Sequence, residues 1–176
     1  MLLPLLPRES GLLWALDFRN ECFPLSDSIE ITVTLEDFPL EELKDLLAAG
    51  ETSRIHFEAR LFQERRGILS LIGDQMLEAK EKVYSIHYDR LGRYFVLHTP
   101  SGDTVFKSFV SLVRPLRSTH FTFNRRESEG HYLETRVTFL PRKLVPPFNL
   151  LEIFFLNNKT RLKWKKIPLN YDEGGL

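Results

Sequence analysis

The stretch RIHFEARLF, residues 54–62, alternates apolar and polar side chains from its first position. Its odd-numbered residues from 55 to 61 are all apolar, and its even-numbered residues from 54 to 60 carry charged or imidazole side chains. A period of two is typical of a β-strand that buries one face. The stretches IEITVTL, residues 29–35, and HYLETRVTFL, residues 131–140, repeat the pattern. The sequence therefore predicts a protein built mainly from β-strands.

Two stretches depart from this period and predict short helices. In residues 40–49, leucines recur at helical spacing between Pro39 and Gly50, and Asp37 is a candidate cap. Residues 104–113 also carry an apolar stripe at helical spacing, after a turn at residues 100–102. We expect Asp103 to cap this second helix and Pro115 to end it.

These elements predict an antiparallel β-sandwich of six to eight strands in two packed sheets, of which the immunoglobulin fold is one version. An open antiparallel sheet with helices on one face is the alternative. We expect residues 11–170 to form a single domain and residues 171–176 a disordered tail. Residues 1–10 begin with an apolar run, but this run contains two prolines and is ended early by the charged residues Arg8 and Glu9. They are interpreted either as the remnant of a signal peptide or as a flexible leader.

The overall composition excludes several classes of function. The chain has 176 residues, and its 24 basic and 24 acidic side chains balance, so net charge does not direct it to nucleic acid. Cys22 is the only cysteine, which rules out an internal disulfide and a cysteine-based metal site. The sequence also lacks the motifs of serine hydrolases, zinc proteases, nucleotide-binding loops and EF-hands. We expect no cofactor.

A hairpin in residues 84–99 contains two histidines. If Arg90, Leu91 and Gly92 form a three-residue loop with Gly92 at positive φ, His87 and His98 lie on opposite faces of the sheet. They then share neither a metal ion nor a proton relay, although a four-residue loop would bring them together. Residues 67–73, which follow an earlier strand, fit neither period and are interpreted as an irregular, partly apolar excursion.

Two segments near the C-terminus are candidate binding surfaces. In RLKWKK, residues 161–166, basic side chains alternate with Trp164, a pattern found in contacts with anionic surfaces and also in edge strands protected by lysines. The candidate contacts are Arg161, Lys163, Lys165 and Lys166. In VPPFNLLEIFFL, residues 145–156, a dense apolar block is either a buried strand or an exposed patch for a partner. The candidate partner-binding residues are Pro147, Phe148, Phe154 and Phe155.

The order of several motifs resembles an uncharacterised bacterial family, domain of unknown function 4390, over roughly residues 12–169. The similarity lies in YSIHYDRLGRYFVL, FKSFVSLVRPL, HYLETRVTFLP, the Pro147-Phe148 pair and the closing NKTRLKWKKIPL. Membership would imply an exported protein of the periplasm or cell envelope, encoded near a sensor histidine kinase, and without export the location would be cytoplasmic. The family supplies no catalytic residues.

Three functions compete on this basis. The first is a non-enzymatic binding or adaptor module of the bacterial envelope. Its expected partner is another envelope protein, such as a sensor kinase, and peripheral contact with the membrane is a further option. The second is a carrier or sensor of a small apolar ligand or lipid, held between the sheets or under residues 67–73. The third is an enzyme of unrecognised type, which would depend on His87 or His98. Nucleic acid is not an expected partner.

Overall fold

The computed structural model describes residues 14–25, 27–124, 130–140 and 164–169. Within them the chain forms strands β1 (Trp14–Ala15), β2 (Asp17–Pro24), β3 (Ser28–Asp37), β4 (Ser53–Gln63), β5 (Gln75–Asp89), β6 (Tyr94–Thr99), β7 (Gly102–Phe106), β8 (Ser118–Asn124), β9 (His131–Leu140) and β10 (Lys165–Pro168). The helices are α1 (Leu40–Ala48), the 3₁₀ helix η1 (Gly67–Ile72) and α2 (Phe109–Leu116). The described residues thus hold ten strands, more than the six to eight expected.

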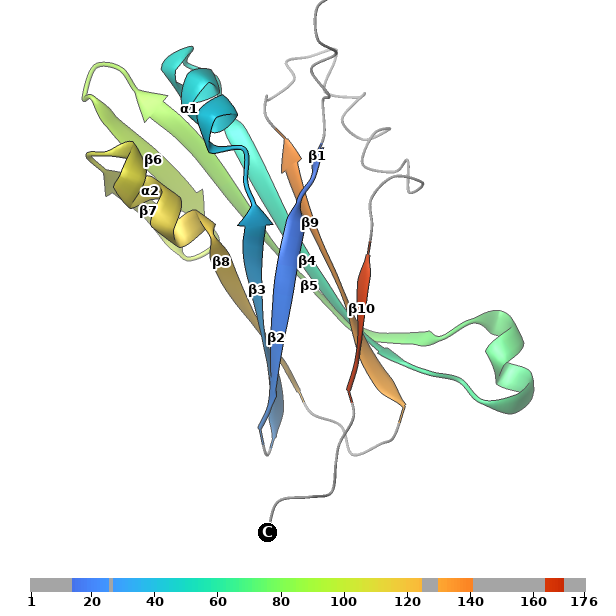
Figure 1. Cartoon of the computed structure of the whole chain (residues 1–176). Coiled ribbons are helices and arrows are strands. Elements are labelled where there is room, and N and C mark those ends of the chain that lie inside the picture. Colours follow the sequence, from blue (N-terminus) through green and yellow to red (C-terminus); the bar gives the residue numbers. More distant parts are fainter. Residues whose placement is uncertain (1–13, 26, 125–129, 141–163, 170–176) are drawn as a thin grey trace, which may run out of the picture.

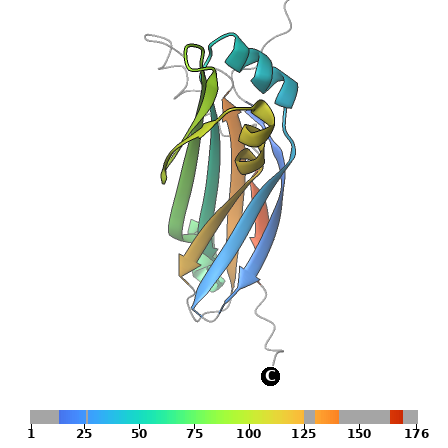
Figure 2. The same ribbon diagram turned by 90° about the vertical axis from the view of Figure 1, so that its left-hand side faces the viewer.

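The strands form two antiparallel sheets, as predicted. The larger sheet has the order β1-β9-β4-β5-β6-β7, with β10 also paired to β9, and the smaller has the order β2-β3-β8. The two sheets face each other as a sandwich that is open at its sides (Figures 1 and 2). The alternative of a single open sheet is therefore wrong. The finer expectation of an immunoglobulin type stays a prediction.

The core between the sheets comes from the alternating stretches. Ile29, Ile31, Val33 and Leu35 of β3 and the odd-numbered residues 55–61 of β4 are buried, as their period of two predicts. Phe121 and Phe123 of β8 complete the smaller sheet's inner face. Full burial of such a side chain contributes about 1.5–3 kcal/mol relative to exposure, so this interior is the main source of stability. Residues 131–140 are buried at almost every position, so β9 departs from the single buried face that its period of two predicts.

Both α-helices lie at one end of the sandwich (Figures 1 and 2). Helix α1 matches the predicted range, and Leu43, Leu46 and Leu47 bury its apolar face. Its predicted cap is wrong, because Asp37 belongs to β3 and Pro39 occupies the cap position without a side-chain hydrogen bond.

The second helix begins later than predicted. Residues 102–106 form β7, since Thr104, Val105 and Phe106 favour a strand, and α2 starts at Phe109. Ser108 caps the helix through its Oγ, which accepts the Ser111 N–H at 3.2 Å. The prediction that Asp103 caps the helix is therefore wrong. Pro115 lies within α2 instead of ending it.

The loop between β5 and β6 also differs from the prediction. Its register pairs Asp89 with Tyr94, which leaves the four residues 90–93 in the loop instead of three. Asp89 stabilises this longer loop, because its Oδ1 accepts the N–H of Leu91 at 2.9 Å and that of Gly92 at 3.0 Å. Arg93, at φ 56°, takes the positive φ expected of Gly92. A glycine is still needed at position 92, since an added Cβ would lie 2.0 Å from the Tyr94 ring.

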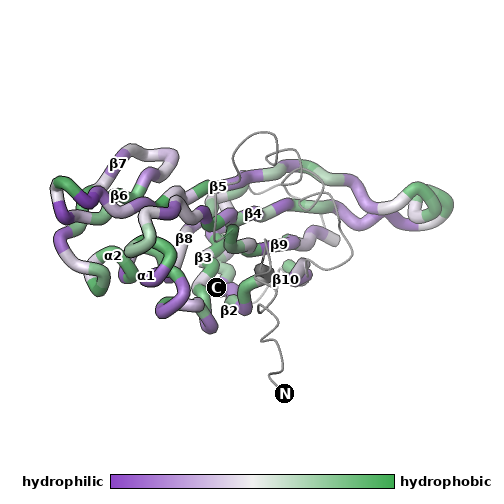
Figure 3. The backbone as a smooth tube through the Cα atoms, turned by 90° about the horizontal axis from the view of Figure 1, so that it is seen from above, coloured by the Kyte–Doolittle hydropathy of each residue, from purple (hydrophilic) through white to green (hydrophobic). Residues whose placement is uncertain are grey.

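Residues 64–74, which join β4 to β5, form a hairpin arm that contains η1 and extends past the end of the larger sheet, because β4 stays paired with β9 as far as Gln63. The arm projects away from the helical end (Figure 1), and the view from above shows the same separation (Figure 3). The two strands stay paired from Ser53 and Ile86 out to Gln63 and Gln75. The irregular excursion predicted for residues 67–73 is thus a 3₁₀ turn at the far end of the arm, and the next strand begins at Gln75.

Candidate functional site

The end of the hairpin arm exposes a cluster of apolar side chains. Ile68 is 85% exposed, Leu69 60%, Leu71 86% and Ile72 69%. In Figure 3 this end is the strongly apolar extremity of the molecule, remote from the sandwich. Isolated exposed leucines are ordinary on a protein surface, but adjacent ones on a projecting element mark a contact site. We call residues 67–73 the apolar tip.

The tip is a locally closed turn. Gly67 and Gly73 flank it at φ 64° and 80°, conformations that a side chain at either position would strain. The Ser70 hydroxyl donates to the Gly67 carbonyl at 2.7 Å, and the Gly73 N–H donates to the Ser70 carbonyl at 3.2 Å. The polar side chain of the tip is therefore satisfied within the turn, and its apolar side chains point outward.

The base of the arm is attached to β9 through Asp74. The carboxylate of Asp74 accepts the Tyr132 hydroxyl at 2.8 Å and the Arg65 N–H at 3.2 Å. These hydrogen bonds, the Tyr132 bond first, lower the pKa of Asp74 below its ordinary value. Burial, with the Asp74 contact second, raises the pKa of Tyr132, so its hydroxyl stays a donor. Glu64 adds a backbone bond from its N–H to the Gly130 carbonyl at 2.8 Å. The apolar tip is thus held on an anchored arm.

Cationic side chains surround the base of the tip. Arg65 and Arg66 immediately precede Gly67, and the Arg66 side chain is exposed. Lys166 of β10 lies nearby, because its Nζ is 2.9 Å from Glu64 and 3.6 Å from the centre of the Tyr132 ring. The apolar surface is thus bordered by these cations and by the carboxylates of Glu64 and Asp74.

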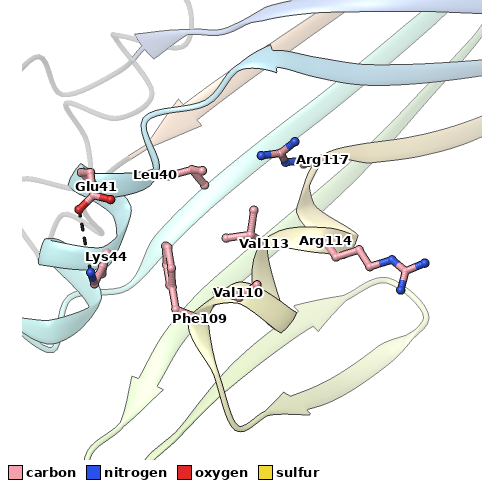
Figure 4. Close-up of a pocket in the computed structure, with 8 residues that line it drawn as sticks. All are labelled: Leu40, Glu41, Lys44, Phe109, Val110, Val113, Arg114 and Arg117. Carbon is pink, nitrogen blue, oxygen red and sulfur yellow. Dashed lines mark ion pairs between the residues drawn. The ribbon is translucent and has the colours of Figure 1, made fainter.

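A second candidate surface is a pocket of about 520 Å³ between α1 and α2 (Figure 4). Its apolar lining comes from Leu40, Phe109, Val110 and Val113, and its cations are Lys44, Arg114 and Arg117. Lys44 lies 4.0 Å from the Glu41 carboxylate. Among the described residues, no carboxylate forms an ion pair with Arg114 or Arg117. The pocket has the character needed for a small amphipathic anion.

The two histidines of the β5–β6 hairpin lie together, so the prediction of opposite faces is wrong. The four-residue loop shifts the register by one residue, which places the rings of His87 and His98 5.1 Å apart in a stacked arrangement. The Nδ1 of His98 is 2.6 Å from the Asp103 carboxylate, which fixes the ring's orientation. His98 and Asp103 are open to solvent. Within the described ranges, no three side chains of His, Cys, Asp or Glu gather in a way that could hold a metal ion.

The structure places only part of the predicted basic strand. Arg161 and Lys163 lie outside the described residues. Lys165 turns inward, where its Nζ donates to the Phe18 carbonyl and lies 4.5 Å from the centre of the Phe18 ring. Lys166 pairs with Glu64, as described above. Their predicted contact with an anionic surface stays a prediction.

Trp164 has a structural role. The centre of its ring lies 4.2 Å from the guanidinium carbon of Arg60 and 4.4 Å from that of Arg136. Arg136 in turn donates from Nε to Glu58 at 2.6 Å. Trp164 therefore fastens the start of β10 onto the outer face of the larger sheet.

The predicted partner-binding residues Pro147, Phe148, Phe154 and Phe155 lie outside the described residues. Reasoning from sequence did not select the apolar tip. A signal was present in the sequence, because GILSLIG contains five uncharged residues between two glycines. This stretch also follows a strand whose own alternating residues already supply apolar side chains to the core. In the part of the chain that the structure describes, no helix is both long and apolar enough to cross a membrane.

No protein-family model, no curated protein and no solved structure matches this chain. The resemblance to domain of unknown function 4390 accordingly stays a prediction, and the case for function depends on the geometry above.

Proposed function

We propose that this chain is a non-enzymatic binding module of the bacterial cell envelope, which engages its partner through the apolar tip. The observation that carries this proposal is the exposure of four large aliphatic side chains at the end of an anchored arm. Each contributes about 1.5–3 kcal/mol when a contact removes it fully from water. Several such side chains together can support specific association after the entropic cost of binding is met.

The placement of the tip supports a contact role over a folding role. Its side chains do not reach the core between the sheets, because η1 lies beyond the sandwich. The anchoring of Asp74 to Tyr132 limits the motion of the arm's base. An apolar element that is rigidly presented and adds little to the core is well suited to recognition.

Photo-crosslinking in the native host tests the proposal. A benzophenone side chain at position 71 is compared with the same probe at position 91, since Leu71 and Leu91 are both highly exposed leucines on hairpin loops. We expect recurrent adducts, protein or lipid, at position 71 alone. A captured protein counts only if its purified form binds the chain and Leu71→Asp abolishes the binding. Equal adducts at both positions, or none, would contradict the proposal.

The pocket between α1 and α2 favours a second function, the carriage of a small amphipathic anion. Its apolar lining and Arg117, which forms no ion pair with a described residue and lies beside the apolar side chains in Figure 4, match an acyl chain with a carboxylate or phosphate head, and Arg114 adds a cation at the rim. This candidate predicts that mass spectrometry of an organic extract finds an anionic lipid in the purified protein. The ligand should be absent from the Arg114→Gln/Arg117→Gln variant, and an extract without ligand would oppose this function.

A further inference from the structure

We infer that the partner of the apolar tip is a lipid bilayer containing anionic lipids, into whose interface the tip inserts. This inference rests on the proposed function and names the partner of the same site. In the inserted state the aliphatic side chains lie at the boundary of the acyl chains, and the arginines at the base lie among the phosphates.

The apolar side chains of the tip form two rows that point in different directions. A 3₁₀ helix has three residues per turn, so Ile68 aligns with Leu71, and Leu69 aligns with Ile72 about a third of a turn away. Both rows are exposed, at 60–86% for the four side chains. A groove on a folded protein would cover one row and leave the other largely in water. A fluid apolar phase surrounds a convex tip and covers both.

An unsatisfied polar group is costly in the water-poor part of a bilayer. Residues 67–73 include no charged side chain. The one polar side chain, Ser70, bonds to the Gly67 carbonyl, and the Gly73 N–H bonds to the Ser70 carbonyl. The turn thus enters an apolar environment with these groups already paired.

The cations at the base of the tip are Arg65, Arg66 and Lys166, and the anions are Glu64 and Asp74. Glu64 is paired with Lys166, and the Asp74 carboxylate is held by the Tyr132 hydroxyl and the Arg65 N–H. Among these five side chains the cations outnumber the anions by one, and Arg66 is exposed beside the apolar residues. A basic border next to an apolar surface is complementary to anionic headgroups.

The tip projects past the end of the larger sheet, at the extremity of the molecule opposite the helices (Figures 1 and 3). The tip can therefore enter the interface while the sandwich stays in water. Met76, at the start of β5 and more than half exposed, adds a further apolar side chain next to the tip.

Vesicle co-sedimentation of the full chain tests the inference. Unilamellar vesicles of phosphatidylcholine are compared with vesicles in which about a third of the lipid is phosphatidylglycerol. We expect the chain to bind the anionic vesicles, and Leu71→Asp to lower the partition coefficient about tenfold or more. Leu91→Asp, the matched control at a leucine that is 99% exposed, should leave it unchanged. Circular dichroism establishes that both variants are folded.

A second pair of measurements separates insertion from attraction to the surface. Arg65→Gln/Arg66→Gln should lower binding to the anionic vesicles about fivefold for each arginine and leave binding to phosphatidylcholine unchanged. An environment-sensitive dye on Leu71→Cys, in a Cys22→Ser background, should shift to the blue with vesicles. The same dye on Leu91→Cys should not.

Failure of this inference is distinguishable from failure of the proposed function. If vesicles do not bind, or bind Leu71→Asp as well as the unmodified chain, the bilayer is not the partner. A validated protein adduct at position 71 would then keep the proposed function and overturn the lipid inference alone. A dimer in analytical ultracentrifugation that Leu71→Asp dissociates, without vesicle binding, would make a second copy the occupant and overturn it as well. No vesicle binding and no adduct would remove both.

Discussion

Replacing Glu58 by glutamine should destabilise the protein far more than the same change at a surface ion pair. Glu58 lies on the outer face of β4, where its Oε2 is 2.6 Å from the Nε and 2.5 Å from the Nη2 of Arg136. The two side chains are only 14% and 10% exposed. Trp164 covers the guanidinium groups of both Arg136 and Arg60, so little water can replace the carboxylate.

The magnitude follows from what remains after the change. Removing one partner of a buried ion pair leaves the other charge uncompensated, which typically costs 3–5 kcal/mol. Because glutamine retains an oxygen that accepts a hydrogen bond, we expect Glu58→Gln to lower the free energy of unfolding by about 3 kcal/mol, the low end of that range. Arg19 and Glu21 lie 2.8 Å apart but are 62% and 44% exposed. Glu21→Gln should therefore cost about 0.5 kcal/mol.

Urea unfolding followed by circular dichroism measures both values, and a constant slope shows that the unfolded state is unchanged. The double variant Glu58→Gln/Arg136→Met removes the uncompensated charge and should recover more than about 1 kcal/mol relative to Glu58→Gln. If Glu58→Gln costs no more than Glu21→Gln, or if the double variant recovers nothing, then the cluster around Trp164 does not hold β10 as argued.

Three further predictions concern the β5–β6 loop and the cysteine. The hydrogen bond from the Gly92 N–H is the largest cause that lowers the pKa of Asp89 below its ordinary 3.8. The ionised Asp89 carboxylate therefore stabilises the fold above that value, and this stabilisation is lost as the pH falls through the lower pKa of the folded state. The difference in unfolding free energy between the unmodified chain and Asp89→Asn should shrink on acidification below about pH 4, and a constant difference would contradict the assignment. Gly92→Ala should cost about 1–3 kcal/mol because its Cβ would overlap the Tyr94 ring, and in denaturant unfolding the cost should fall in a Tyr94→Ala background. Burial raises the pKa of the Cys22 thiol, so the pH profile of its alkylation by iodoacetamide should have a midpoint above that of a free thiol, and a lower midpoint would refute this.

The sequence predicted the sandwich because its strands carry a local signal. Strand β4 shows its buried face in every second residue, and α1 shows its own in the spacing of its leucines. The start of α2 was missed because residues 102–106 fit two structures, and pairing with β6 decided between them. A strand there uses Asp103 to bind His98, whereas a helix would have used it as a cap.

The histidine cluster could not be predicted for a related reason. The residues between Asp89 and Tyr94 suit a loop of three residues as well as a loop of four. A change of one residue in loop length moves every side chain of one strand to the opposite face of the sheet. The choice depends on the two backbone N–H groups that Asp89 accepts and on the ability of Arg93 to adopt positive φ. Neither is a periodic feature. Similarly, the exposure of residues 68–72 depends on how far β4 and β5 extend beyond the core, which no local pattern encodes.

The apolar tip is the feature of this fold that stability explains least. Side chains that are 60–86% exposed add little to the core, so polar residues at these positions would fold equally well and would lower the risk of aggregation. Other large apolar side chains, such as Leu91 and Val110, are exposed singly, and a sheet edge elsewhere in the molecule is protected. At the edge of the smaller sheet, Lys80 and Lys82 of β5 donate to carbonyl groups of β8, and the core side chains of both sheets are enclosed. The arm instead presents aliphatic side chains, its base is anchored through Asp74 and Tyr132, and arginines lie beside the apolar residues. We therefore interpret the arm as an element whose apolar side chains become buried only when a second phase or molecule covers them. Leu71→Asp should therefore leave the free energy of unfolding within about 0.5 kcal/mol of the unmodified chain while it abolishes the contact, which separates the role of the tip from the stability of the fold.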